Sequence, residues 1–233
     1  MIPLHDEKSP RGYPIVTRLL LAINVALWLY VVYLSRTPGA LEAFYGRWAF
    51  DPAEIAGAIT NGSVGPLTFA PLVTHMFLHG GWLHIIFNML YLWIFGDNVE
   101  DTLGSATFLL FYLVCGIVAA IGQGLLAAGP LVGASGAIAG VLGAYLLMFP
   151  TARIATLVFL GIFITVIELP AIIVIGLFIV VQVLEGVAEL RLGVPAAQHV
   201  AYFAHVFGFL AGMLLLPVLR GRSASRRTKV GWG

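Results

Sequence analysis

Long apolar runs between helix-breaking residues constrain this chain more than any other feature of its sequence. A helix needs about 20 mostly apolar residues to cross a bilayer, and runs of this kind recur along the 233 residues. Since 60% of the residues are apolar and only 10% are charged, we expect a multi-pass membrane protein of the all-α class with a bundle of six transmembrane helices. The candidate spans are Pro14 to Leu34, Trp82 to Gly96, Ala106 to Ala127, Gly133 to Met148, Pro170 to Val187 and Val200 to Leu219.

The basic residues gather near the two ends of the chain and set the expected topology. Lys8 and Arg11 precede the first run, and a basic stretch from Arg220 to Lys229 follows the last one. Because basic flanks stay in the cytoplasm, six spans place both termini there. We expect a cytoplasmic N-terminal tail over 1–12, a membrane domain over 13–219 and a basic cytoplasmic tail over 220–233, in the plasma (inner) membrane of a bacterium. Without an interior basic patch, no nucleic-acid partner is expected.

Two connections between the runs are long. The first, from Arg36 to about His79, is too hydrophobic for a disordered linker and is expected to fold against the membrane surface. The second, from Arg153 to Leu169, is apolar, but a seventh span would move the basic C-terminal stretch outside. We therefore expect an interfacial or hairpin segment on the cytoplasmic side. The lone Cys115 excludes a disulfide framework within the chain.

Strongly polar side chains are costly inside a bilayer, so those within the runs are functional candidates. His84 and Asn88 are four residues apart and share one helix face, Ser135 lies near the start of the fourth run, and His205 lies near the start of the sixth. The second, fourth and sixth runs all enter from the outer side. At 1.5 Å rise per residue, Ser135 and the two histidines therefore lie at similar shallow depth and can meet.

A serine and two histidines suit acyl transfer. Ser135 is the expected nucleophile and His205 the general base that activates it. His84, Asn88 and the Ser135 backbone N–H would stabilise the oxyanion. No cofactor and no metal ion are expected. Other interpretations stay open, since the serine can serve helix packing, a lone histidine can relay protons, and the asparagine can join two helices.

Small residues favour the required close approach. Gly136 and Gly140 on the fourth run, and Gly208 and Gly212 on the sixth, form two small-xxx-small faces. Gly133 adds a further small residue just before the serine. These faces would bring Ser135 within reach of His205.

The motifs around these residues resemble those of the rhomboid family of intramembrane serine proteases, from about Arg47 to Leu216. The matching stretches, in the family's order, are "HIIFN" at 84–88, "FGDNVE" ending at Glu100, "GASG" at 133–136 and "AHVFGFLAG" at 204–212. The resemblance implies a six-helix core and a Ser135–His205 dyad without an acidic third member. It also implies that the partners are the lipid bilayer and single-span transmembrane substrates, cleaved in or beside their membrane segment.

Other details of the resemblance concern structure. Arg47 and Trp48 resemble an outer-loop motif of the family with a structural role, and His75 and His79 match positions that are structural there.

One departure concerns the catalytic histidine. The family often has an aromatic residue four positions after the serine that packs on the histidine ring, but this chain has Ala139. We therefore expect Tyr202 or Phe207 to support His205.

Three alternatives compete with the protease. The cluster of His75, His79 and His84 suggests a metalloprotease, but HExxH and a nearby carboxylate ligand are missing. A small transporter should show repeated halves or mid-membrane charges. The third alternative is a catalytically silent rhomboid-like protein that binds membrane helices.

Overall fold

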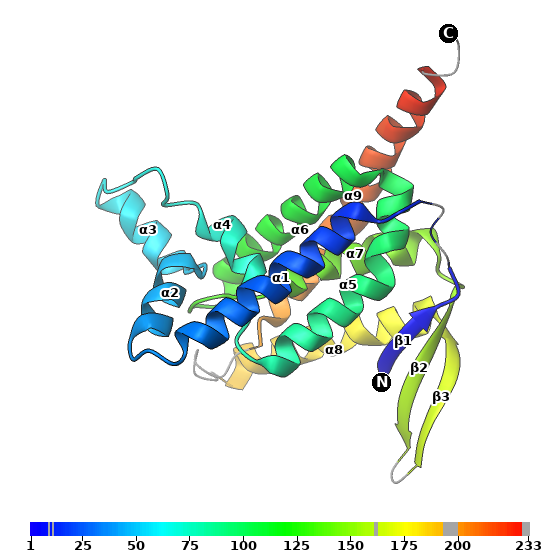
Figure 1. Ribbon diagram of the computed structural model, residues 1–233, viewed down its shortest axis with the longest axis horizontal. Coiled ribbons are helices and arrows are strands. Elements are labelled where there is room, and N and C mark those ends of the chain that lie inside the picture. The colour runs from blue at the N-terminus through cyan, green and yellow to red at the C-terminus, as the bar shows by residue number, and fades with distance from the viewer. Residues whose placement is uncertain (9, 11, 161–162, 193–199, 230–233) are drawn as a thin grey trace.

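The chain forms a helical bundle with a small sheet at one end (Figure 1), in a computed structural model that describes residues 1–8, 10, 12–160, 163–192 and 200–229. Four helices are long and apolar enough to cross a membrane, and a fifth qualifies when it is counted with a short segment bent from it by 94°. The protein is therefore an integral multi-pass membrane protein. The bundle helices are α1 (Ile15–Leu34), α5 (Trp82–Leu103), α6 (Ser105–Leu126), α7 (Ser135–Met148), α8 (Ala171–Leu192) and α9 (Tyr202–Lys229).

The short helix α7 occupies the middle of the bundle. Its residues from Gly136 to Tyr145 are all buried, and α5, α6 and α9 pack around it. Fourteen residues rise about 21 Å, which is less than the roughly 30 Å of a hydrocarbon core. Because other helices surround α7, its polar first turn is enclosed by protein.

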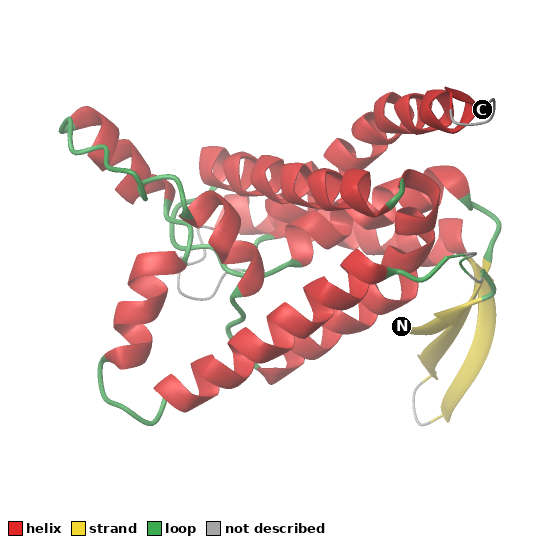
Figure 2. Ribbon diagram, turned by 45° about the horizontal axis from the view of Figure 1, so that its top comes forward, coloured by secondary structure: helices red, strands yellow, loops and turns green. Residues whose placement is uncertain are grey.

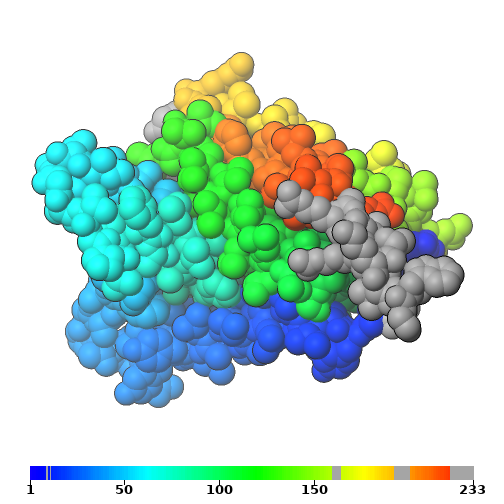
Figure 3. Space-filling model, turned by 90° about the horizontal axis from the view of Figure 1, so that it is seen from above, coloured from blue at the N-terminus to red at the C-terminus, as the bar shows by residue number. Residues whose placement is uncertain are grey.

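A folded segment connects α1 to α5. It contains α2 (Ala40–Trp48), α3 (Pro52–Thr60), α4 (Pro71–Thr74) and the 3-10 helix η1 (His75–Phe77), and it forms one end of the molecule in the space-filling view (Figure 3). Asp51 starts α3 by accepting a hydrogen bond from the Ala53 N–H at 2.9 Å. The segment is thus ordered by its own helices, as its apolar composition predicts.

At the other end of the bundle lies a three-stranded antiparallel sheet, with strand order β1-β2-β3 (Figure 2). Its strands are β1 (Ile2–Asp6), β2 (Arg153–Leu160) and β3 (Phe163–Pro170). The segment from 153 to 169 is therefore a hairpin, favoured by its β-branched residues and by the prolines beside it. The all-α prediction is wrong in this respect, and residues 2–6 are a paired strand within what we expected to be a tail.

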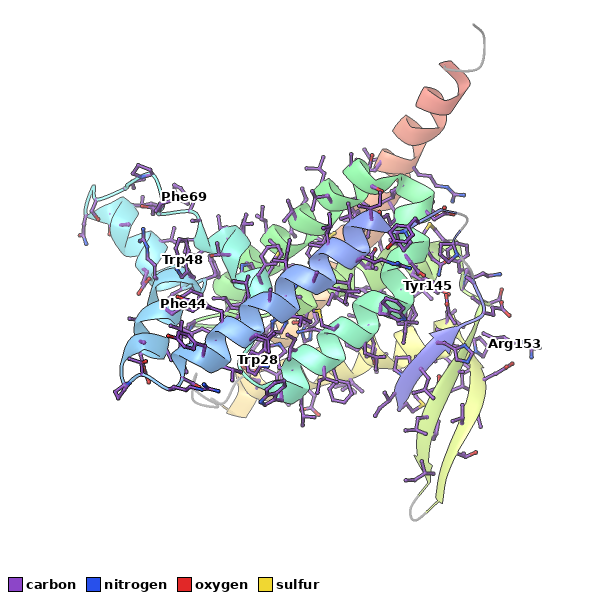
Figure 4. All side chains as sticks on the ribbon, viewed as in Figure 1. Trp28, Phe44, Trp48, Phe69, Tyr145 and Arg153 are labelled. Carbon is purple, nitrogen blue, oxygen red and sulfur yellow. The ribbon has the colours of Figure 1, made fainter. Side chains whose placement is uncertain are left out.

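Polar contacts fix β1 to the bundle. Asp6 accepts hydrogen bonds from the Tyr145 hydroxyl at 2.5 Å and from Asn98 Nδ2 at 3.1 Å. Tyr145 is buried and packs edge-on against Phe95, with ring centroids 4.9 Å apart. Figure 4 shows Tyr145 at the end of the bundle that carries the sheet. The N-terminal strand is therefore part of the fold through α5 and α7.

Two helices run beyond their expected ends. Helix α5 continues past Gly96 to Leu103 because polar residues in its last turns have partners. The Glu100 carboxylate accepts hydrogen bonds from the Val16 N–H at 3.0 Å and the Thr17 N–H at 2.7 Å, which caps the start of α1. Helix α9 extends through Lys229 into the expected basic tail, of which 230–233 lie outside the described residues.

Candidate active site

Three of the predicted site residues lie in the first turns of three helices that run in the same direction, and Asn88 lies one turn further along α5. Helices α5, α7 and α9 all begin at the end of the bundle that carries α2, α3 and α4 (Figure 1). His84 is the third residue of α5, Ser135 the first of α7 and His205 the fourth of α9. This is the arrangement that a common depth requires.

His84 and Ser135 both lie close to Gly133. A Cβ atom on Gly133 would lie 2.7 Å from His84 Nε2 and 3.6 Å from Ser135 Oγ. The φ angle of Gly133 is +126°, a conformation that favours glycine. Its N–H donates a hydrogen bond to the His75 carbonyl at 2.9 Å, which fixes the loop that leads into the serine. Gly133 therefore shapes this loop rather than a contact between two helices.

The paired glycines bring α7 and α9 into backbone contact. A Cβ on Gly208 would collide with the Gly136 carbonyl, and one on Gly212 would collide with the Gly140 carbonyl. The helices therefore cross with no side chain between them at these two levels.

This crossing brings the neighbours of Ser135 and His205 together. A Cβ on Gly136 would lie 3.7 Å from Ala204 Cβ. In the part of the chain that the structure describes, no hydrogen bond joins the Ser135 hydroxyl to the His205 ring. Such a bond is often long in a substrate-free site and shortens when substrate binds.

The His205 ring is supported by α8. Its Nδ1 lies 2.6 Å from Gln182 Oε1, and its ring centroid lies 5.9 Å from that of Phe178 at an interplanar angle of 40°. The preceding Ala204 N–H donates a hydrogen bond to Gln123 Oε1 on α6 at 2.9 Å. Helices α6 and α8 thus fix the start of α9.

The expectation that Phe207 supports the ring is wrong, and among the described residues the ring contact of His205 is with Phe178 rather than with Tyr202. Phe207 lies against Gly122 on α6, where an added Cβ would collide with its side chain. The physical reason is helix geometry, because a residue two positions after His205 points about 200° away around α9. Tyr202 packs beside Gly186, with its Cβ 3.3 Å from the position of a Cβ there.

Two side chains at the site can donate hydrogen bonds to a developing negative charge. Asn88 is buried, and its Nδ2 has no hydrogen-bond partner among the described residues. His84 Nδ1 accepts from the Gly80 N–H at 3.4 Å, so a neutral His84 ring carries its proton on Nε2. That nitrogen is the one beside Gly133 and Ser135.

His75 and His79 belong to the connecting segment. His75 is buried, with Nδ1 2.8 Å from the Pro71 carbonyl. The His79 carbonyl accepts a hydrogen bond from the Tyr45 hydroxyl at 2.5 Å, and the His79 ring lies 5.1 Å from that of His84. Among the described residues, no three His, Cys, Asp or Glu side chains form a group that could bind a metal ion.

Trp48 and Arg47 also contribute to this segment. The Trp48 carbonyl accepts a hydrogen bond from Thr74 Oγ1 at 2.7 Å, and the Arg47 guanidinium lies 5.6 Å from the Trp48 ring centroid. These contacts fit a structural role.

Sequence reasoning missed Gln182 and Gln123. Both are strongly polar side chains inside apolar runs, which is the same signal that singled out His84 and His205. Applied without exception, that criterion finds them.

Comparison with known proteins relates the chain to one family. The chain is 35% identical over 135 residues to the Rhomboid protease GluP of Bacillus subtilis (strain 168), over 58% of this chain and 25% of that protein. It is 28% identical over 231 residues to RHOMBOID-like protein 1 of Arabidopsis thaliana, over 87% of this chain and 52% of the relative. The Rhomboid protease GlpG of Yersinia pestis (strain Pestoides F) is 34% identical over 71 residues, which are 30% of this chain and 26% of that protein.

The matches to these relatives cover at most about half of each relative's length. A sequence model of the Rhomboid domain matches residues 66–222, the part of the chain that contains His84, Asn88, Ser135 and His205. Since this match covers more than half of the chain, the chain belongs to the rhomboid family.

Proposed function

We propose that the protein is an intramembrane serine endopeptidase in which Ser135 is the nucleophile and His205 the general base. The observation that carries this proposal is that His84 Nε2 and Ser135 Oγ both lie within 4 Å of the position that a Cβ on Gly133 would take. This position lies at the end of the bundle where α9 begins, with His205 as the fourth residue of that helix. A nucleophile, a base and a hydrogen-bond donor at one place are the parts that acyl transfer needs.

The reaction would begin when Ser135 Oγ attacks the carbonyl carbon of the scissile peptide bond and its proton passes to His205 Nε2. A C–O bond forms, and the carbonyl π electrons move onto the oxygen. Collapse of this intermediate breaks the C–N bond, and His205 returns the proton to the leaving nitrogen. Water then attacks the acyl ester on Ser135 with His205 as base, which releases the acid product and restores the serine hydroxyl.

Three donors would stabilise the oxyanion. The His84 Nε2–H lies beside the serine, and the Asn88 amide has an unused donor among the described contacts. The Ser135 N–H belongs to the first turn of α7, where helix N–H groups have no partner within the helix. Removal of one such donor from an enzyme of this kind typically costs a factor of about 100 to 1,000 in kcat.

The proposed substrates are single-span transmembrane proteins. The two relatives with protease in their names support peptide-bond cleavage, although the matches cover only part of each. We further propose that α1, α5, α6, α7, α8 and α9 all span the membrane. This arrangement would put β1 and the basic end of α9 on the cytoplasmic side. The bacterial inner membrane stays a prediction, since the relatives include a plant protein.

The test measures cleavage of a single-span substrate by purified protein, together with labelling by a fluorophosphonate. Ser135→Ala and His205→Ala should lower the cleavage rate by about a millionfold, since loss of either member disables the pair. Ser63→Ala, in the connecting segment, is the matched control and should retain both activities. Wild-type rates in Ser135→Ala would end the proposal, and wild-type protein that binds membrane helices but takes no label would favour the silent relative.

A further inference from the structure

We infer that Gln182 on α8 is a positioning residue for His205, which makes the site a group of three side chains rather than a dyad. Gln182 Oε1 lies 2.6 Å from His205 Nδ1. Both residues are buried, with 9% and 8% of their surfaces exposed. The inference rests on the proposed function, because it concerns how His205 acts as a base.

The chemistry of the amide oxygen determines which ring nitrogen is basic. A carboxamide oxygen can only accept a hydrogen bond, so His205 must carry its proton on Nδ1. Nε2 is then unprotonated and free to take the proton of Ser135. After the transfer, the same contact stabilises the imidazolium, because the amide oxygen faces the N–H that gains positive charge.

Phe178 restricts the orientation of the His205 ring plane. It lies four residues before Gln182, so both side chains project from the same face of α8. The Phe178 ring packs against the His205 ring, while Gln182 binds its edge. Together they take the place of the aromatic support that the small, fully buried Ala139 cannot give.

The two histidines of the site are therefore prepared for opposite tasks. His84 lies in the first turn of α5, at the end of the bundle where α9 begins. Its Nδ1 accepts from Gly80, so its Nε2 is a donor. His205 has its Nδ1 as donor, so its Nε2 is an acceptor. One ring can thus serve the oxyanion and the other the serine.

The first experiment compares Gln182→Met with wild type in substrate cleavage and in fluorophosphonate labelling. Methionine has a similar length but lacks the amide acceptor, so we expect kcat and the labelling rate to fall about 10-fold to 100-fold with KM nearly unchanged. Gln182→Glu keeps an acceptor and should restore most of the loss. Val181→Met, the same new side chain at an exposed neighbouring position of α8, should leave the rates unchanged.

The second experiment reads the tautomer directly. Nitrogen-15 chemical shifts of His205 in detergent micelles should indicate a protonated Nδ1 in wild type and a mixture of tautomers in Gln182→Met. Wild-type protein that the fluorophosphonate does not label would refute the proposed function itself. If the fluorophosphonate labels wild type and Gln182→Met cleaves substrate and takes the label at the same rates, only the inference is refuted. A rate loss that merely follows the folded fraction, with an unchanged tautomer, would also overturn it.

Discussion

A methyl group at Gly208 would test whether the backbone contact between α7 and α9 sets the geometry of the site. In Gly208→Ala the new Cβ would collide with the Gly136 carbonyl oxygen and lie 2.9 Å from the Gly136 carbonyl carbon. Ordinary contacts between such atoms are about 3.5 Å or longer, so the helices must separate by about 1 Å or more. Because the neighbour is backbone, it has no rotamer that would make room.

The magnitude follows from the position of the catalytic groups. Ser135 precedes Gly136, and His205 lies one turn before Gly208. A displacement of about 1 Å between reacting groups typically costs about 100-fold in rate. Overpacking of a core costs about 1–3 kcal/mol, and we expect the upper part of that range here.

The assay is fluorophosphonate labelling of Ser135 together with thermal unfolding in detergent. Gly176→Ala on α8 is the matched control, because a Cβ there meets nothing within 4 Å. It should keep the labelling rate and gain up to about 1 kcal/mol of helix propensity. Equal labelling rates and unfolding temperatures in the two variants would refute the reasoning.

Two further predictions concern the opposite end of the bundle. Glu100→Gln weakens the cap on α1, where the carboxylate accepts from the Thr17 N–H and hydroxyl, and should lower the free energy of unfolding by about 2–3 kcal/mol. An unchanged unfolding temperature would contradict this. Burial raises the pKa of Asp6, so the folded state binds the proton of the Asp6 carboxyl more tightly than the unfolded state does. The docking of β1 should therefore weaken as the pH rises from 3.8 through the raised pKa. Asp6→Asn keeps an acceptor for Tyr145 and should remove this pH dependence, measured as the hydrogen-exchange protection of β1. An equal pH dependence in wild type and Asp6→Asn would rule out Asp6 as its source.

The helices of the bundle were predictable because apolar length is a local property of the sequence. The starts of the six runs lie within a few residues of the helix starts, and proline or glycine marks the first five of them. The end of α5 was not predictable in this way. Glu100 looks like a residue that ends a span until its partners at Val16 and Thr17 are known.

In the site, too, the features local to the sequence were predictable and those that depend on distant partners were not. His84, Ser135 and His205 are visible because each is polar near the start of an apolar run. The support of His205 depends on Phe178 and Gln182, which belong to a different helix and come into contact only through the packing of α8 on α9. Reasoning from the neighbours of His205 in the sequence therefore selected the wrong aromatic residue. The strand β1 was not predicted for a similar reason, because five residues are too few to show a strand pattern of their own.

The pairing of β1 with β2 has a consequence for the order of folding. Since α1, α5, α6 and α7 all lie between these strands in the chain, β1 is synthesised long before its partner exists. Contacts between such distant segments form late, because the intervening chain must first be ordered. If the strands meet in the cytoplasm, residues 2–6 must wait there unpaired while the central helices insert. The closing of this sheet would then report that α1, α5, α6 and α7 have inserted, before α8 and α9 follow in the chain.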